Sequence, residues 1–198
     1  MYLFGASGHA KVILDILRVS GINVQGFIDD DPSKKELWGI PVLGDTQAYQ
    51  SSWTPCLISI GNNRLRKKVA DAVESTYSTA IHPSALIADS VEIGEGTVLM
   101  AGSVINPDTR IGRHVIVNTR ASVDHDCSIS DFVHIAPGST LCGGITVGEG
   151  TLIGSGATIL PNVTIGKWAT IGAGATVTQD IPDNATAVGC PAKIIKHA

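Results

Sequence analysis

Charged side chains are scarce in this sequence. Asp, Glu, Lys and Arg make up 16% of the 198 residues, and the formal net charge is −4 at pH 7. The negative net charge argues against general binding to nucleic acid, which depends on cationic contacts with phosphates, and no long run of Lys and Arg contradicts this. So low a charged fraction suits a fold whose surface is partly covered by other copies of the same chain.

Cysteine pairs with metal-binding spacing and long apolar runs are also missing. The four cysteines show no C-x-x-C spacing, which predicts neither a zinc knot nor a disulfide scaffold. No apolar stretch approaches the ~20 residues that span a membrane, and the first residues lack the pattern of a signal peptide. We therefore expect a cytoplasmic protein with reduced thiols and no membrane span.

The beginning of the chain has the pattern of a strand, a glycine-rich turn and a helix. Residues 2–4 form a short apolar run, residues 5–10 contain the turn, and residues 11–17 place their apolar side chains on one helical face. The N–H groups at such a helix start favour an anion such as a diphosphate, although a plain tight turn explains the pattern equally well. The full G-x-G-x-x-G signature is absent, so a nicotinamide cofactor is not favoured.

The pattern continues as a small Rossmann-like α/β domain, which we predict over residues 1–79. Asp29 and Asp30 follow the second strand, where an acid can bond a ribose hydroxyl or a base edge, or can belong to a solvated turn. Ligands of such sheets lie where the strands end. The further elements are expected as strands at residues 24–28 and 56–60, an extended, loop-like segment at 40–44, the start of a short helix at 45–49, and a helix at 65–74.

A six-residue repeat fills most of the remaining chain. From Ile81 to Val177 every sixth residue is Ile, Leu or Val, seventeen times without a change of register. The fourth residue after each is mostly small or β-branched, which keeps the interior narrow. A hexapeptide period predicts a β-helix. It resembles the left-handed parallel β-helix of hexapeptide-repeat acyltransferases, which implies three hexads per coil and five to six coils within residues 80–198.

Three hexads per coil stack residues that are eighteen apart, about 4.8 Å from one another. The rule forms two adjacent columns, one of Gly138, Gly156 and Gly174 and one of Pro137, Ser155 and Ala173. We expect a strip with few side chains and accessible backbone amides, suited to the thin pantetheine arm of coenzyme A. The alternative is that glycine only helps the corners to turn.

The same rule places His125 beside Gly143. Acyl transfer from a thioester needs a base for the incoming nucleophile and a donor for the developing oxyanion. His125 has a suitable pKa range, Asp126 or Asp124 could orient its ring, and the Gly143 N–H could hold the oxyanion. The alternative is a surface histidine in an acidic loop. Cys127 is expected to face the interior, so we expect direct transfer rather than an acyl-cysteine.

The remaining histidines suggest other roles. We expect substrate contact for His9, structural or packing roles for His82 and His114, and none for His197. A zinc-dependent lyase on the same fold needs three converging histidines. His114, His125 and His134 do not stack by the eighteen-residue rule, so we expect no metal.

The sequence Asp124-His125-Asp126-Cys127, His134, and the Gly-Ala-Ser-Gly-His turn resemble sugar O- and N-acyltransferases with a small α/β domain and a left-handed β-helix. The nearest are N-acetyltransferases of UDP-4-amino-4,6-dideoxy sugars in bacillosamine biosynthesis, and sialic acid O-acetyltransferases. The resemblance implies a homotrimer with active sites between neighbouring helices. It implies His125 as general base with Asp126, where the family often has Glu; His134, Gly143, Ser155, Gly156, Ala173, Gly174 and Lys193 for coenzyme A; and Ser7, Gly8, His9, Asp29, Asp30 and Gly61 for the nucleotide sugar.

We therefore expect an N-acetyltransferase that uses acetyl-CoA to acylate the amine of a UDP-4-amino-4,6-dideoxy sugar. O-acetylation of a sialic acid or similar sugar is the alternative within acyl transfer. A metal-dependent lyase and a non-catalytic β-helix are the alternatives from other classes.

Overall fold

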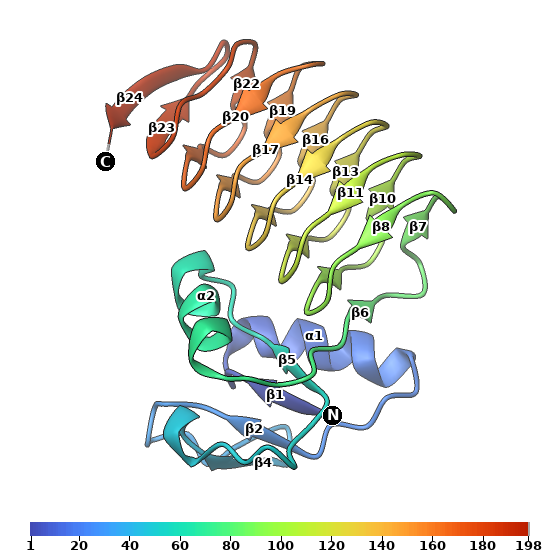
Figure 1. Ribbon diagram of the computed structural model, residues 1–198, viewed down its shortest axis with the longest axis vertical. Helices are drawn as coiled ribbons and strands as arrows, with labels where there is room; N and C mark the ends of the chain where they lie inside the picture. Colours follow the sequence, from blue (N-terminus) through green and yellow to red (C-terminus); the bar gives the residue numbers. More distant parts are fainter. Residues whose placement is uncertain (198) are drawn as a thin grey trace.

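A small α/β part and a β-helix make up the computed structural model, which describes residues 1–197 (Figure 1). The α/β part lies alongside the β-helix, and the C-terminal hairpin of β23 (Ala185–Val188) and β24 (Lys193–His197) lies at the far end of the stacked coils. Among these residues, no helix is both long enough and apolar enough to cross a membrane.

The α/β part contains a five-stranded sheet in the order β3-β4-β2-β1-β5. All neighbours pair in parallel except β3 and β4, which are antiparallel. Residues 40–44 pair in this sheet, so the expectation of a loop-like segment there is wrong. The elements are β1 (Tyr2–Phe4), α1 (Gly8–Val19), β2 (Gly26–Ile28), β3 (Glu36–Leu37), β4 (Ile40–Gly44), the 3-10 helix η1 (Thr46–Ala48), β5 (Cys56–Ile58) and α2 (Asn63–Ala72).

The two helices cover opposite faces of this sheet. Because side chains alternate along a strand, Leu3 and Leu57 pack under α1 while Phe4 and Ile58 pack under α2. Full burial of such a side chain contributes about 1.5–3 kcal/mol, and this holds both helices against the sheet.

The β-helix consists of two-residue strands on three faces. The first face holds β6 (Ala80–Ile81), β9 (Val98–Leu99), β12 (Ile116–Val117), β15 (His134–Ile135), β18 (Leu152–Ile153) and β21 (Thr170–Ile171). The second holds β7 (Leu86–Ile87), β10 (Val104–Ile105), β13 (Ser122–Val123), β16 (Thr140–Leu141), β19 (Thr158–Ile159) and β22 (Thr176–Val177). The third holds β8 (Glu92–Ile93), β11 (Arg110–Ile111), β14 (Ser128–Ile129), β17 (Thr146–Val147) and β20 (Thr164–Ile165).

The predicted register of eighteen is confirmed on every face. Leu99 pairs with Val117, Val117 with Ile135, and Ile135 with Ile153, all in parallel. The seventeen strands from β6 to β22 make between five and six coils, as the repeat predicts, and the helix is left-handed. The repeated Ile, Leu and Val residues form one continuous interior with the small residues four positions later.

In the α/β part, α1 packs on the first three coils of the first face. The outward side chains of β6, β9 and β12 (Ala80, Val98 and Ile116) are buried against α1. The first face continues at the far end into β23 (Ala185–Val188) and β24 (Lys193–His197), which pair antiparallel to each other. α2 lies along the corner between the third and first faces, where its side chains reach His114, Phe132, Gly150 and Trp168.

Candidate active site

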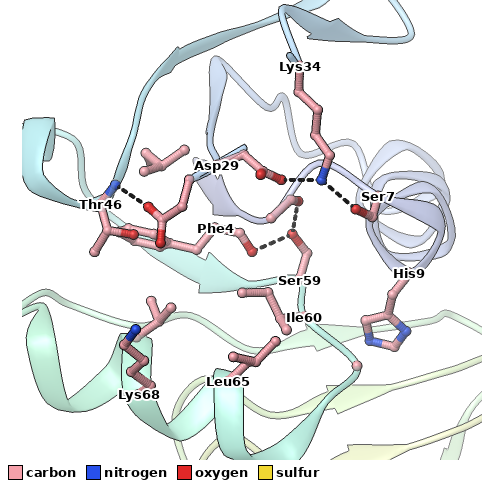
Figure 2. Close-up of a pocket in the computed structure, with 15 residues that line it drawn as sticks. Phe4, Ser7, His9, Asp29, Lys34, Thr46, Ser59, Ile60, Leu65 and Lys68 are labelled. Atoms are coloured by element: carbon pink, nitrogen blue, oxygen red, sulfur yellow. Dashed lines mark hydrogen bonds and ion pairs between the residues drawn. The ribbon is translucent and has the colours of Figure 1, made fainter. Parts of the chain in front are cut away.

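A cavity of about 360 Å³ lies at the carboxyl ends of β1, β2 and β5, as the sheet topology predicts (Figure 2). Of the six residues expected to bind a nucleotide sugar, five line it, and Gly8 lies between two of these. The five are Ser7, His9, Asp29, Asp30 and Gly61. Gly5 turns the chain below the cavity at φ +98°, where a Cβ would clash with Ile60.

Asp29 holds the turn together. Its Oδ2 accepts hydrogen bonds from the Ala6 N–H (2.6 Å) and the Lys34 ammonium (2.8 Å), which lowers the pKa of this carboxyl. Burial acts in the opposite direction and is the largest single influence on that pKa. Lys34 also donates to the Ser7 hydroxyl (2.7 Å), so Ser7 does not cap the N-terminus of α1 with its side chain (Figure 2).

Two cations of this cavity were missed by the sequence reasoning. Lys34 comes from the loop after β2, and Lys68 comes from α2. Lys68 is exposed and makes no ion pair within residues 1–197. Neither residue belongs to the glycine-rich turn, and each reaches the cavity only through the tertiary fold. Lys34 is paired with Asp29, so Lys68 and the uncapped start of α1 are the groups left to attract an anion.

The second cluster lies at the corner between the second and third faces, which we call the His125 corner. His125 Nδ1 lies 2.7 Å from Asp126 Oδ2, so the shorter Asp side chain reaches the ring. Asp124 instead accepts from Asn106 (2.8 Å) and from the His125 backbone N–H (2.9 Å). The structure thus selects Asp126 as the partner of the ring, a choice that the sequence left open.

The pKa of His125 is raised above its ordinary value. The hydrogen bond that His125 donates to Asp126 is the largest cause, and the negative charge of Asp124 adds to it. Because Nδ1 donates to the carboxylate, Nε2 is left as the proton acceptor. Asp126 stands at φ +58°, in a left-handed conformation that Asp tolerates, and this turns its carboxylate toward the preceding side chain.

Gly143 lies against the His125 ring, as the eighteen-residue rule predicts. A Cβ at Gly143 would lie 2.6 Å from Cε1 and 2.7 Å from Nε2 of that ring. The Gly143 N–H makes no hydrogen bond among residues 1–197 and is available as a donor. Cys127 faces the interior, donates to the Cys142 carbonyl and has a thiol pKa raised by burial, so it is not placed as a nucleophile.

The glycine column lies at another corner, between the first and second faces. The expectation of accessible amides in the two-column strip is wrong for the glycines, because the N–H groups of Gly138, Gly156 and Gly174 all bond to the preceding coil. The unbonded N–H groups are one position earlier, at Ser155 and Ala173. A Cβ on any of the three glycines would meet open space, so the strip is indeed poor in side chains. Lys193 lies beyond it, exposed, at the start of β24.

His134 lies on the first face, apart from the His125 corner. Its ring centroid is 6.2 Å from that of His9, and Asn118 Nδ2 lies 3.1 Å from its Nε2. Burial first, and the positive charge of Arg66 second, lower the pKa of both His9 and His134 to about 4. Within one chain the structure therefore groups His134 with the expected substrate residues rather than with Gly143.

The three histidines of the metal-site alternative lie apart. His114 is fully buried, stacked on Phe132 and edge-on to Tyr77, while His125 is exposed at its corner and His134 lies on the first face. His82 Nδ1 accepts the Ser84 N–H in a local turn. The side chain of His197 lies outside the described part of the chain.

The fold and the two clusters define a class of protein, the β-helical transferases built on hexapeptide repeats. Residues 1–73 match the family described as PglD N-terminal domain, and residues 144–179 match bacterial transferase hexapeptide (six repeats). Among curated proteins, an uncharacterized protein of Acanthamoeba polyphaga mimivirus is 36% identical over 76 residues. That match covers 37% of this chain and only 15% of the viral protein.

Solved structures match over the whole chain. A perosamine N-acetyltransferase from Caulobacter crescentus, in complex with CoA and GDP-perosamine, is 41% identical, with a TM-score of 0.92 over 98% of this chain and 96% of that chain. The acetyltransferase domain of PglB from Neisseria gonorrhoeae (36%, TM-score 0.91) and WeeI from Acinetobacter baumannii (32%, TM-score 0.90) each match over 98% of both chains. This chain belongs to the hexapeptide-repeat sugar acyltransferases, which take their acyl group from acetyl-CoA.

Proposed function

We propose that this protein transfers the acetyl group of acetyl-CoA to the amine of a nucleotide-linked 4-amino-4,6-dideoxy sugar. The His125–Asp126 pair with its ring against Gly143 carries this proposal. The sequence resemblance favours a UDP-linked acceptor, whereas the Caulobacter relative was solved with GDP-perosamine, so both nucleotides belong in the test. We also propose that the α/β unit (residues 1–79) binds the nucleotide and that the β-helix (residues 80–198) carries the acyl-transfer chemistry.

The proposed chemistry needs one base and one oxyanion donor. His125 Nε2 takes a proton from the sugar amine as the amine nitrogen attacks the thioester carbonyl. The Gly143 N–H holds the developing oxyanion. The C–S bond then breaks, an amide is formed, and the leaving coenzyme A thiolate takes the proton that His125 holds. Asp126 keeps the ring oriented and stabilises its charged form.

Direct transfer from acetyl-CoA to the sugar is the proposed route. Cys127 is buried at the interior, so the His125 corner lacks an evident nucleophile of its own. The Caulobacter relative was solved with CoA and GDP-perosamine together, which supports a ternary complex. For the coenzyme we propose the open strip at Ser155, Gly156, Ala173 and Gly174, with Lys193 as a further contact. We assign His134 to the acceptor instead, because its ring lies 6.2 Å from that of His9.

We propose that the active site is completed between copies of the chain in a homotrimer. The cavity of about 360 Å³ at the ends of β1, β2 and β5, for which we propose nucleotide binding, is called the nucleotide cavity below. This cavity and His134 lie on the side of the first face, whereas the His125 corner joins the other two faces. One chain therefore cannot bring its own His125 to its own nucleotide cavity. A neighbouring copy can supply the missing half.

The test is a panel of UDP- and GDP-linked sugars with free amines or only hydroxyls, assayed with acetyl-CoA by release of the coenzyme thiol. We expect release with an amino sugar and a product that resists mild alkali, as an amide does. An alkali-labile product would establish O-acetylation instead. Absence of release with every acceptor would refute the proposal, and stoichiometric zinc in the purified protein would favour the lyase.

The general base is tested separately with the best acceptor of the panel. Replacement of His125 by Ala should lower kcat by about 10²–10⁴-fold, the usual contribution of a positioned base. Retention of near-full activity would show that His125 is not the base. His82→Ala is the matched control, because that ring bonds only within its own turn among the described residues.

A further inference from the structure

Arg66 is the largest fully buried side chain of the described chain, with 1% of its surface exposed. It lies on α2 and points toward the β-helix rather than toward solvent. No carboxylate within residues 1–197 forms an ion pair with it. A buried charge without a counter-charge is expensive, and an apolar side chain of similar volume would fill the space at lower cost. Packing alone therefore does not account for an arginine here.

The guanidinium joins three segments that are far apart in the sequence. Its donors reach the carbonyls of His114 (2.8 Å), Ile60 (3.1 Å), Gly61 (3.2 Å) and Phe132 (2.8 Å), and the side-chain oxygen of Asn63 (2.9 Å). A rigid planar fork satisfies carbonyls on several sides at once, which a lysine ammonium does not reproduce. Asn63 extends this hydrogen-bond network to a further coil by donating to the Gly150 carbonyl (3.0 Å).

The three segments meet beside the His9–His134 pair. Gly61 packs on the His9 ring, since a Cβ placed there would lie 3.6 Å from Cγ of that ring. His134 follows two residues after Phe132 on the β-helix. A second cavity, of about 350 Å³, is lined by both Gly61 and His134, so it adjoins the nucleotide cavity at this place. The sugar end of a nucleotide sugar would lie where the two cavities adjoin.

We propose that Arg66 is a positioning residue for the acceptor: it fixes the loop at Gly61 against the coil that carries His134 and so sets the geometry between the nucleotide cavity and the first face. The inference rests on the proposed function, because it assumes that a nucleotide sugar occupies these cavities. Arg66 does not itself line either of them.

The charge of Arg66 supports the same assignment. Together with burial, this charge keeps His9 and His134 neutral. Among the charged groups, Arg66 lowers the pKa of each ring the most. His9 also acts on His134, and no carboxylate contributes to the pKa shift of either ring. A neutral imidazole keeps one acceptor nitrogen for a sugar hydroxyl, whereas an imidazolium ring would only donate. Nε2 of His134 already lies 3.1 Å from Asn118 Nδ2, so His9 is the freer of the two rings.

The experiment compares wild type with Arg66→Met, which removes the charge and the fork, and Arg66→Lys, which keeps the charge. Tyr77→Phe is the matched control, because Tyr77 is buried at the same junction and its hydroxyl donates only to Val73 within the α/β part. We expect Arg66→Met to raise KM for the nucleotide sugar at least tenfold and leave KM for acetyl-CoA unchanged. Arg66→Lys should recover only part of the loss, and Tyr77→Phe should change neither KM.

A second readout does not need an acceptor. Titration of the His9 and His134 rings by NMR in the protein alone should show both pKa values raised in Arg66→Met and close to wild type in Arg66→Lys. If wild type acetylates no sugar, the proposed function fails, but this titration still tests the effect of Arg66 on the His9 and His134 rings. Unchanged ring titration, or an equal loss for both substrates in a folded Arg66→Lys protein, would overturn the proposal. If Arg66→Met does not fold, the KM values of Arg66→Lys decide it alone.

Discussion

The His125–Asp126 pair makes a prediction about pH. A general base works only when it is neutral, and Asp126 raises the pKa of His125, so activity should rise with pH through a midpoint above the ordinary value for histidine. Asp126→Asn removes the charge and should move this midpoint to lower pH while lowering the plateau, because the ring loses its orientation and its counter-charge. The measurement is kcat/KM against pH for both proteins. A midpoint that stays in place would show that Asp126 does not act on the base.

Gly143 makes a second prediction at the residue scale. The Cβ of Gly143→Ala would occupy space now taken by the His125 ring, 2.6 Å from Cε1. That ring is 59% exposed and can move aside, so the melting temperature should change little while kcat falls about tenfold or more through the displaced base. Equal activity of Gly143→Ala and wild type would contradict the proposed role of this contact.

Residue positions in the site could be predicted only where the repeat fixes the register. The spacing of eighteen places Gly143 beside His125 because each coil has the same length. The choice between Asp124 and Asp126 depends on a left-handed backbone angle that the sequence pattern does not reveal. The spacing of Arg66 gives a signal for its burial, since it lies three and seven residues before Val69 and Val73 on the apolar side of its helix. Its charge, however, favours a position in solvent.

At the scale of elements, the interior of the β-helix predicts a graded response to truncation. Ile153 is fully buried in a middle coil, whereas Ile87 is only partly buried near the first coil. Ile153→Ala should therefore lower the free energy of unfolding by about 2–5 kcal/mol, and Ile87→Ala by less. Denaturant unfolding of the two variants gives the comparison. A larger loss for Ile87→Ala would show that the first coils, rather than the middle, limit stability.

The elements also explain what the glycines do. From residue 96 to residue 174, the fourth position of every hexad has a positive φ, and glycine occupies half of these corners. The others carry side chains such as Asp126, Phe132 and Trp168 in the same conformation. Glycine is therefore favoured by the corner but is not required by it. The column at Gly138, Gly156 and Gly174 owes its regular spacing to the coil, and its open surface is the feature that bears on a ligand.

On the scale of the whole molecule, the fold was readable because one period of six extends over seventeen hexads. The α/β part has no such repeat to fix its register. The sequence therefore does not predict residues 40–44 as a strand, since their pairing with β2 depends on partners distant in sequence. The separation of the cavity at the ends of β1, β2 and β5 from the His125 corner does not follow from the repeat either, although the family resemblance implies sites between neighbouring helices. It follows from which face of the β-helix receives α1, and this is decided by outward side chains such as Val98 and Ile116.

This separation predicts complementation between two inactive variants. His125→Ala damages the corner and leaves the cavity, whereas Lys68→Glu places a negative charge in the cavity and leaves the corner. In a trimer whose sites form between copies, each trimer that contains both variants should regain one of its three sites, because each site needs one intact half from each of two chains. Co-expression with two different tags, followed by tandem purification and the thiol assay, measures this.

The matched control pairs His125→Ala with a chain that carries both substitutions. None of its sites can hold an intact corner, so no activity should return, although the same subunits assemble. Recovery in the first mixture but not in the control requires that a corner of one chain serves the cavity of another. A mixture that stays inactive while both tags purify in one trimer would place the whole site within a single chain, against the geometry that sets His125 opposite the first face.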